Sequence, residues 1–118
     1  LNWIPELVSL AQKDNSLDGR AIIAATIVLI LKIDDKDFLP LIDNNVIATL
    51  VSMSGKKNSE LGNNYILSAM KTIANNEEKF QILARTKRII PNLQSIISNN
   101  PKRVQDIEDL IFSIKYLV

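Results

Sequence analysis

The side chains that most often carry enzyme chemistry are absent or scattered in this chain. Its 118 residues include no cysteine and no histidine. Without cysteine there is no thiolate nucleophile, disulfide or thiolate zinc site, and without histidine the commonest general base and metal ligand is missing. Ser16, Ser52 and Ser59 have no base beside them in any catalytic motif, and no phosphate-binding loop is present. The sequence therefore predicts a protein that is not an enzyme and needs no cofactor.

One acidic cluster has the side chains of a hard-cation site. Asp34, Asp35 and Asp37 fall within four residues of one another. They lack the alternating oxygen ligands, the central glycine and the distant glutamate of a calcium-binding loop. A solvated turn between two helices is the better interpretation, and we expect no metal site.

Composition and charge exclude further classes of function. Lys and Arg number 14 against 13 Asp and Glu, so a net charge of +1 gives no field that would attract nucleic acid. The longest apolar stretch, residues 21–33, is too short for membrane insertion. The lack of cysteine suits a reducing compartment, so we expect a cytoplasmic protein, with the nucleus also open. Because the chain starts at Leu1 without an initiator methionine, we expect it to be part of a longer chain.

A spacing of 43 residues organises the sequence. Ile4, Ile47 and Ile90 lie 43 residues apart, and their neighbours repeat with them. Aligned at the same spacing are Pro5/Ala48/Pro91, Leu7/Leu50/Leu93, Ser9/Ser52/Ser95 and Leu10/Met53/Ile96. A period of this length is typical of a helical solenoid, in which neighbouring units bury a core between them. We expect one domain, 1–118, made of units 1–44, 45–87 and 88–118.

Caps and apolar spacing predict a medium helix and then a long helix in each unit. The medium helices are expected near 3–12, 46–54 and 89–98, and the long helices near 17–33, 60–74 and from 101 to near the end. Short helices are expected at 38–42 and 77–85. Ser16 and Ser59 are the predicted N-caps, and residues 99–101 supply a cap and a first-turn proline for the last helix.

The apolar faces of these helices predict the core between the units. It is expected to contain Leu7, Leu10, Ile23, Ile27, Ile30, Leu50, Met53, Ile66, Met70, Ile73, Leu93, Ile96, Ile107, Ile111 and Ile114.

The order of short, medium and long helix in such a unit resembles the armadillo repeat. The resemblance lies in residues 47–53, Ile-Ala-Thr-Leu-Val-Ser-Met, and in residues 68–75, Ser-Ala-Met-Lys-Thr-Ile-Ala-Asn, compared with the family's Ala-Leu-x-Asn-Leu-Ala. It covers the whole chain and implies an all-α, right-handed α-solenoid of about three units, the first without its short helix. Import adaptors of this fold read localisation signals with a Trp and an Asn on each third helix, where this chain has Lys71 and Thr72. Nuclear import is therefore disfavoured.

If the chain folds as an armadillo solenoid, two rows of side chains face its concave groove. They lie opposite the apolar faces of the second and third long helices, at spacings of four, three and four residues. The rows are Asn64, Ser68, Lys71 and Asn75, and Gln105, Asp109, Phe112 and Tyr116. A partner laid along the groove would meet polar side chains first and two aromatic rings last.

Phe112 and Tyr116 are the strongest functional candidates in the sequence. Two rings four residues apart on the polar side of a helix expose an unusual amount of apolar area. Rings near the end of a solenoid also pack on a further repeat or a C-terminal segment, and that alternative stays open. We expect Trp3, near the other end, to cap the core rather than to anchor a partner.

Two functions fit these features. The first is a scaffold or adaptor that binds another protein, as a peptide or a folded domain, along the solenoid surface. The second is a regulator of a partner's conformation, as in armadillo-like myosin chaperones, Hsp70 exchange factors and small-GTPase exchange factors. The two functions differ in whether the partner's folding or nucleotide release changes on binding. No residue of the sequence distinguishes between them. Neither requires a small-molecule substrate.

Overall fold

The computed structural model describes residues 3–13, 16–33 and 43–117, and within these ranges the chain is α-helical without a β-strand. The helices are α1 (Trp3–Lys13), α2 (Leu17–Ile33), α4 (Asn44–Ser54), α5 (Glu60–Ala74), α6 (Glu77–Arg85), α7 (Ile89–Asn99), the 3-10 turn η2 (Pro101–Arg103) and α8 (Val104–Leu117). These bounds agree with the predicted ones to within two residues, except at the start of α8. The short helix predicted at 38–42 lies outside the described residues.

Side-chain caps fix the starts of the two long helices as predicted. The Gly19 N–H donates to Ser16 Oγ at 2.9 Å, and the Gly62 N–H donates to Ser59 Oγ at 3.0 Å. These contacts satisfy N–H groups that have no partner within a first helical turn.

The predicted cap of the last helix is wrong. Asn100 makes no side-chain cap, and residues 101–103 form a 3-10 turn before α8 begins at Val104. The reason is that Asn100 closes the preceding helix: its backbone N–H donates to Ile96 O at 2.9 Å, and the residue is buried. Its backbone carbonyl accepts from the Arg103 N–H at 3.0 Å, so the turn into α8 starts from the backbone of Asn100 and not from its side chain.

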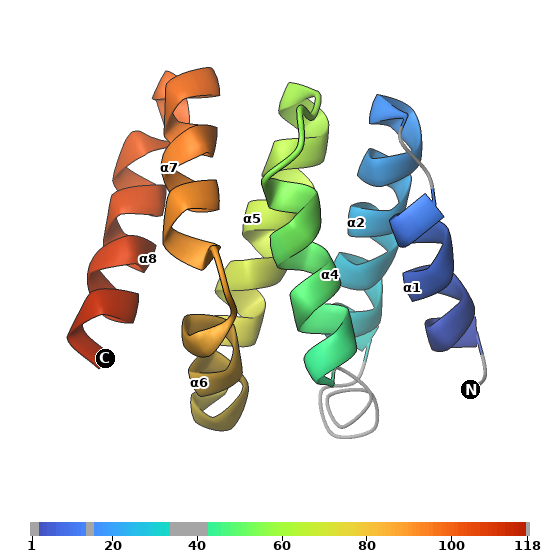
Figure 1. Cartoon of the computed structure of the whole chain (residues 1–118), viewed down its shortest axis with the longest axis horizontal. Coiled ribbons are helices and arrows are strands. Elements are labelled where there is room, and N and C mark those ends of the chain that lie inside the picture. The colour runs from blue at the N-terminus through green and yellow to red at the C-terminus, as the bar shows by residue number, and fades with distance from the viewer. Residues whose placement is uncertain (1–2, 14–15, 34–42, 118) are drawn as a thin grey trace.

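The helices lie in two layers (Figure 1). In one layer α4 packs between α1 and α7, and in the other α2 packs against α5, with α8 beyond α5. Helix α6 contacts α4, α5, α7 and α8 and so connects the layers. The whole has principal extents of 35 × 31 × 23 Å.

One apolar core runs from α2 to α8. Each residue of the predicted core is buried, apart from Leu7, which is half-buried, and Leu10, which is 57% exposed. The prediction for Leu10 is therefore wrong. Its counterparts one and two units later, Met53 and Ile96, are buried because α1 and α4 lie beside them, whereas no described helix covers that side of α1.

Burial in α4 and α7 follows the 43-residue spacing. Both members are buried in the pairs Val46/Ile89, Thr49/Asn92, Leu50/Leu93 and Met53/Ile96, and both are exposed in Ala48/Pro91 and Ser52/Ser95. Three pairs differ: Ile47, Val51 and Ser54 are buried on α4, whereas on α7 Ile90 and Ile97 are half-buried and Gln94 is exposed. Helix α4 has α7 on one side and α1 on the other, whereas the described residues add no further medium helix beyond α7.

Candidate functional site

The two predicted rows lie at the surface of α5 and α8. Asn64 and Ser68 are half-buried, and the remaining members, Lys71, Asn75, Gln105, Asp109, Phe112 and Tyr116, are exposed. Asn75 also ends α5, where its backbone N–H donates to Thr72 O at 3.2 Å. All eight side chains are therefore accessible to some degree from outside.

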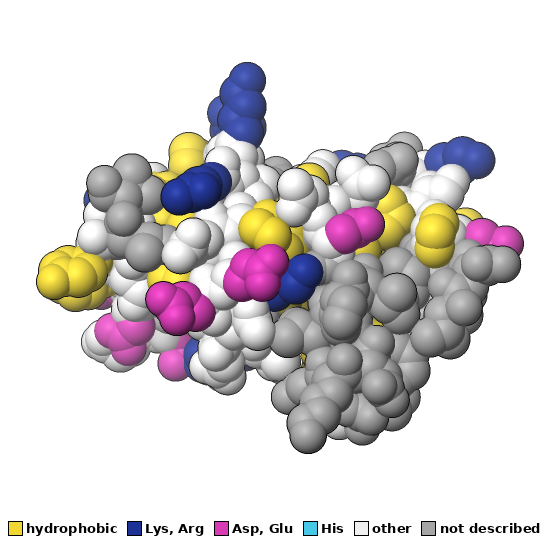
Figure 2. All heavy atoms as spheres, turned by 90° about the horizontal axis from the view of Figure 1, so that it is seen from below, with side chains coloured by type: hydrophobic (Ala, Val, Ile, Leu, Met, Phe, Trp, Pro, Cys, Tyr) yellow, Lys and Arg dark blue, Asp and Glu magenta, His cyan; other side chains and the backbone are white. Residues whose placement is uncertain are grey.

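The two rings of the α8 row form a stacked pair. Phe112 is 71% and Tyr116 is 86% exposed, their ring centroids lie 6.5 Å apart, and their planes differ by 21°. A separation of four residues places the rings one above the other along the helix, in an arrangement favourable for aromatic pairs. Figure 2 shows hydrophobic side chains projecting at the α8 end of the molecule. The pair presents one continuous apolar surface to solvent.

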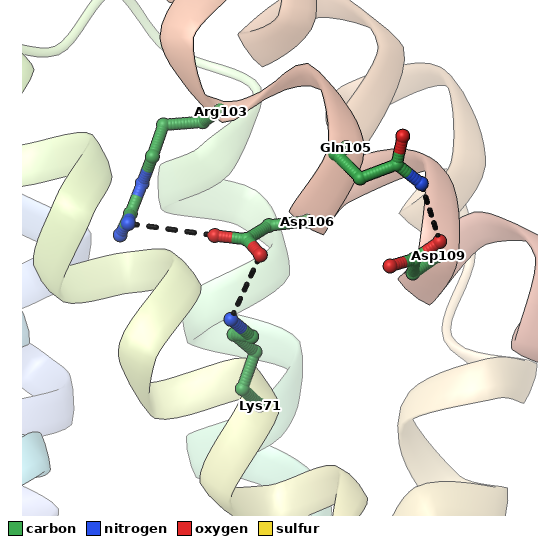
Figure 3. Close-up of polar contacts among 5 residues, drawn as sticks. All are labelled: Lys71, Arg103, Gln105, Asp106 and Asp109. Carbon is green, nitrogen blue, oxygen red and sulfur yellow. Dashed lines mark hydrogen bonds and ion pairs between the residues drawn. The ribbon is translucent and has the colours of Figure 1, made fainter.

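Asp106 joins α5 to the start of α8 (Figure 3). Its Oδ1 lies 3.3 Å from Lys71 Nζ, and its Oδ2 lies 3.5 Å from Arg103 Nη1. All three side chains are partly exposed, so the net stabilisation from these ion pairs is small. The main consequence concerns binding: the Lys71 ammonium group is already paired with Asp106, so a partner would not meet it as a free positive charge.

The α5 and α8 rows do not form one continuous line. Gln105 Nε2 donates to Asp109 Oδ1 at 2.8 Å, and Figure 3 shows both side chains on the side of α8 away from Lys71. The residue that contacts Lys71 is Asp106, which is not a member of either predicted row. The sequence signal for this contact was weak, because Asp106 lies between the apolar and polar faces of its helix and Lys71 lies far from it in the sequence.

A polar hollow lies between the start of α5 and the turn from α7 to α8. It has a volume of about 360 Å³ and is lined by Asn58, Glu60, Asn64, Asn99, Asn100, Pro101, Lys102 and Arg103. Asn64 is the one member of the predicted rows that lines it. Side-chain amides both donate and accept hydrogen bonds, as a peptide backbone does. The other lining residues were not predicted, because they come from the start of α5 and from the connection between α7 and α8, which only the fold brings together.

We also searched the described residues for a second hollow, a metal site and a membrane-spanning helix. A second hollow, of about 550 Å³ between α4 and α6, contains no member of the predicted rows. Within 3–13, 16–33 and 43–117, no group of three or more acidic side chains is placed to hold a metal ion. The acidic cluster Asp34, Asp35 and Asp37 lies outside these ranges. None of the described helices has the length and apolar character needed to cross a bilayer.

Comparison of the chain with protein-family models, with curated proteins and with solved structures finds no match. Function is therefore inferred from the chain's own surface.

Proposed function

We propose that this chain is an armadillo-like repeat module that binds another protein and carries out no chemistry of its own. The repeat is supported by the matching burial of α4 and α7 at a spacing of 43 residues, since equivalent helices of a solenoid bury equivalent faces. A solenoid leaves a long surface free for a partner. The polar hollow and the ring pair both lie on the α5–α8 part of that surface.

The observation that carries the binding proposal is the exposed ring pair on α8. Exposing Phe112 and Tyr116 to water is unfavourable, and covering them with a partner would release that free energy. Aromatic side chains are among the commonest anchors at the centres of protein interfaces. Exposed polar groups of Asp109, Ser113 and Lys115 surround them on the same helix. An apolar centre with a polar rim is the usual composition of a binding surface.

The direct test removes both rings. The double variant Phe112→Ala with Tyr116→Ala should lower the affinity for a purified partner, first captured with the full-length protein, by about 30-fold or more. Its thermal unfolding midpoint should match that of the wild type, because neither ring belongs to the core. Leu61→Ala is the matched control, since Leu61 is an exposed apolar residue on α5 away from the rings.

The opposite pattern would contradict the proposal. If the rings are covered by another part of the full-length protein, their removal would lower the unfolding midpoint and leave the affinity per folded molecule unchanged.

A substitution of Lys71 tests the contribution of the α5 row to the affinity for the same partner. The suitable change is Lys71→Gln, because a glutamate there would face Asp106 and disturb the contact between α5 and α8. Loss of this partly exposed charge should weaken binding by less than loss of the rings. Lys87→Gln, in the turn before α7, is the control for loss of an exposed lysine and should leave binding unchanged.

A further inference from the structure

The α1–α2 end of the molecule exposes an aliphatic surface. On α2, Ile22 is 65% and Leu29 is 60% exposed, and on α1 Leu10 is exposed to a similar degree. Figure 2 shows hydrophobic side chains at this end as well as at the α8 end. Three large aliphatic side chains left in water on neighbouring helices indicate a surface that is covered by another molecule.

The 43-residue spacing shows how this side of a unit is used elsewhere in the chain. The counterparts of Ile22 and Leu29 on α5 are Tyr65 and Thr72, and both are half-buried. On α4 the counterpart of Leu10, Met53, is buried. Helix α4 contacts α1, and α5 contacts α2, so the helices that carry these positions each have a helix of the first unit beside them. The positions exposed on α1 and α2 thus correspond to positions on α4 and α5 that are more buried. We infer that this side of a unit is suited to packing against other helices.

The residue types along one face of α2, which we call the α2 stripe, indicate what kind of surface covers it. Asp18, Ile22, Ala25, Leu29 and Lys32 follow one another at spacings of four, three, four and three residues, which keeps them on one face of the helix. Ala25 is half-buried and the other four side chains are exposed. In the described part of the chain, neither Asp18 nor Lys32 forms an ion pair. The stripe is acidic at one end, basic at the other, aliphatic on both sides of its centre and small at the centre.

We propose that this stripe binds the same stripe of a second copy of the chain. With the two α2 helices antiparallel and a twofold axis at Ala25, Ile22 of each copy meets Leu29 of the other. The same arrangement places Asp18 of each copy beside Lys32 of the other, so each charge gains an opposite one. The small side chain of Ala25 lets the two helices approach at the axis. Such an interface is isologous and closed, and it yields a dimer and not a filament.

The alternative is head-to-tail stacking, in which α8 of one copy packs on the α2 stripe of the next. Its charges match less well than those of the twofold arrangement. On α8 the exposed side chains around Phe112 include Glu108 and Lys115. Stacking that helix on the α2 stripe would bring two different surfaces together, and the pairing of Ile22 with Leu29 and of Asp18 with Lys32 would be lost. The twofold arrangement gives each charge of the stripe a partner of opposite sign and is therefore preferred.

The first test measures the mass of the full-length protein as a function of concentration, by sedimentation or light scattering. The wild type should be a dimer that dissociates on dilution. Ile22→Glu should raise the dimer dissociation constant by about 100-fold, because each dimer loses two aliphatic contacts. The matched control is Leu61→Glu, which alters a similarly exposed leucine outside the stripe and should leave the dimer intact.

Charge reversal tests the antiparallel register. Asp18→Lys alone, or Lys32→Asp alone, places like charges together twice in each dimer and should weaken it, whereas the double reversal should restore it. Because the chain has no cysteine, Ala25→Cys should also give a disulfide-linked dimer on mild oxidation, and Leu61→Cys should not.

Three results would overturn the proposal. They are a monomer at every concentration, single reversals without effect, and a double reversal that fails to restore the dimer. A full-length monomer whose unfolding midpoint falls on Ile22→Glu would show instead that another part of the same polypeptide covers the stripe.

Discussion

At the scale of single residues, the contact between Asn92 and Gly55 fixes how α7 packs on α4. Asn92 Nδ2 donates to Val51 O at 2.8 Å in a buried hydrogen bond. A Cβ atom on Gly55 would lie only 2.8–2.9 Å from the atoms of the Asn92 side-chain amide. Gly55 has a φ of −84°, which any residue adopts, so space and not backbone conformation requires glycine here. The sequence predicted that this helix ends near residue 54, but it could not show that Asn92, far along the chain, requires glycine at position 55.

Gly55→Ala should therefore destabilise the protein. The added methyl group would displace Asn92, and overpacking of this kind costs about 1–3 kcal/mol. Asn92→Ala alone should also be destabilising, through loss of the hydrogen bond to Val51. The double variant should be more stable than the sum of the two effects predicts, because shortening the Asn92 side chain leaves room for the new methyl group. Urea denaturation of the wild type, the two single variants and the double variant measures this coupling, and strictly additive effects would mean that the two residues are not in contact.

At the scale of elements, α5 is the helix on which the rest of the fold depends. It packs against α2, α4 and α6, and Ile66, Met70 and Ile73 on its inner face are fully buried. Its start, its end and its apolar face were all predictable, because caps and helical periodicity are local properties of the sequence. Its ion pair to α8 was not, because Asp106 and Lys71 become neighbours only when two units pack together.

Ile73→Ala should be strongly destabilising. The change removes methylene and methyl groups from a fully buried site, and losses of this kind cost about 2–5 kcal/mol. Leu61→Ala on the same helix is the control and should have little effect, since Leu61 is exposed. Equal midpoints of denaturation for Ile73→Ala and the wild type would show that α5 does not pack as described.

The case of Leu10 shows where prediction from sequence reaches its limit. Leu10, Met53 and Ile96 occupy the same place in the 43-residue spacing, and their sequence contexts gave no reason to separate them. Only Leu10 is exposed, because burial depends on what lies beside a helix and not only on the helix itself. The polar hollow was likewise not predictable, since its residues come from two separate parts of the chain, the start of α5 and the connection between α7 and α8.

At the scale of the whole molecule, the two ends have different surfaces. The α1–α2 end carries an aliphatic stripe with one charge of each sign, and the α8 end carries a stacked ring pair among charged side chains. Because the two surfaces lie on different helices at opposite ends, pairing of two copies through α2 would leave both ring pairs accessible. A dimer would then offer two partner sites, and a partner with two binding segments would gain affinity from engaging both.

The measurement that tests the binding proposal most directly is hydroxyl-radical footprinting of the aromatic side chains in the full-length protein. In the free protein, Phe112 and Tyr116 should be oxidised faster than Phe80 and Tyr65, which are half-buried. In the complex with the captured partner, oxidation of Phe112 and Tyr116 should slow several-fold while that of Phe80 and Tyr65 stays the same. Slow oxidation of the two rings in the free protein, or unchanged oxidation in the complex, would contradict a partner site on α8.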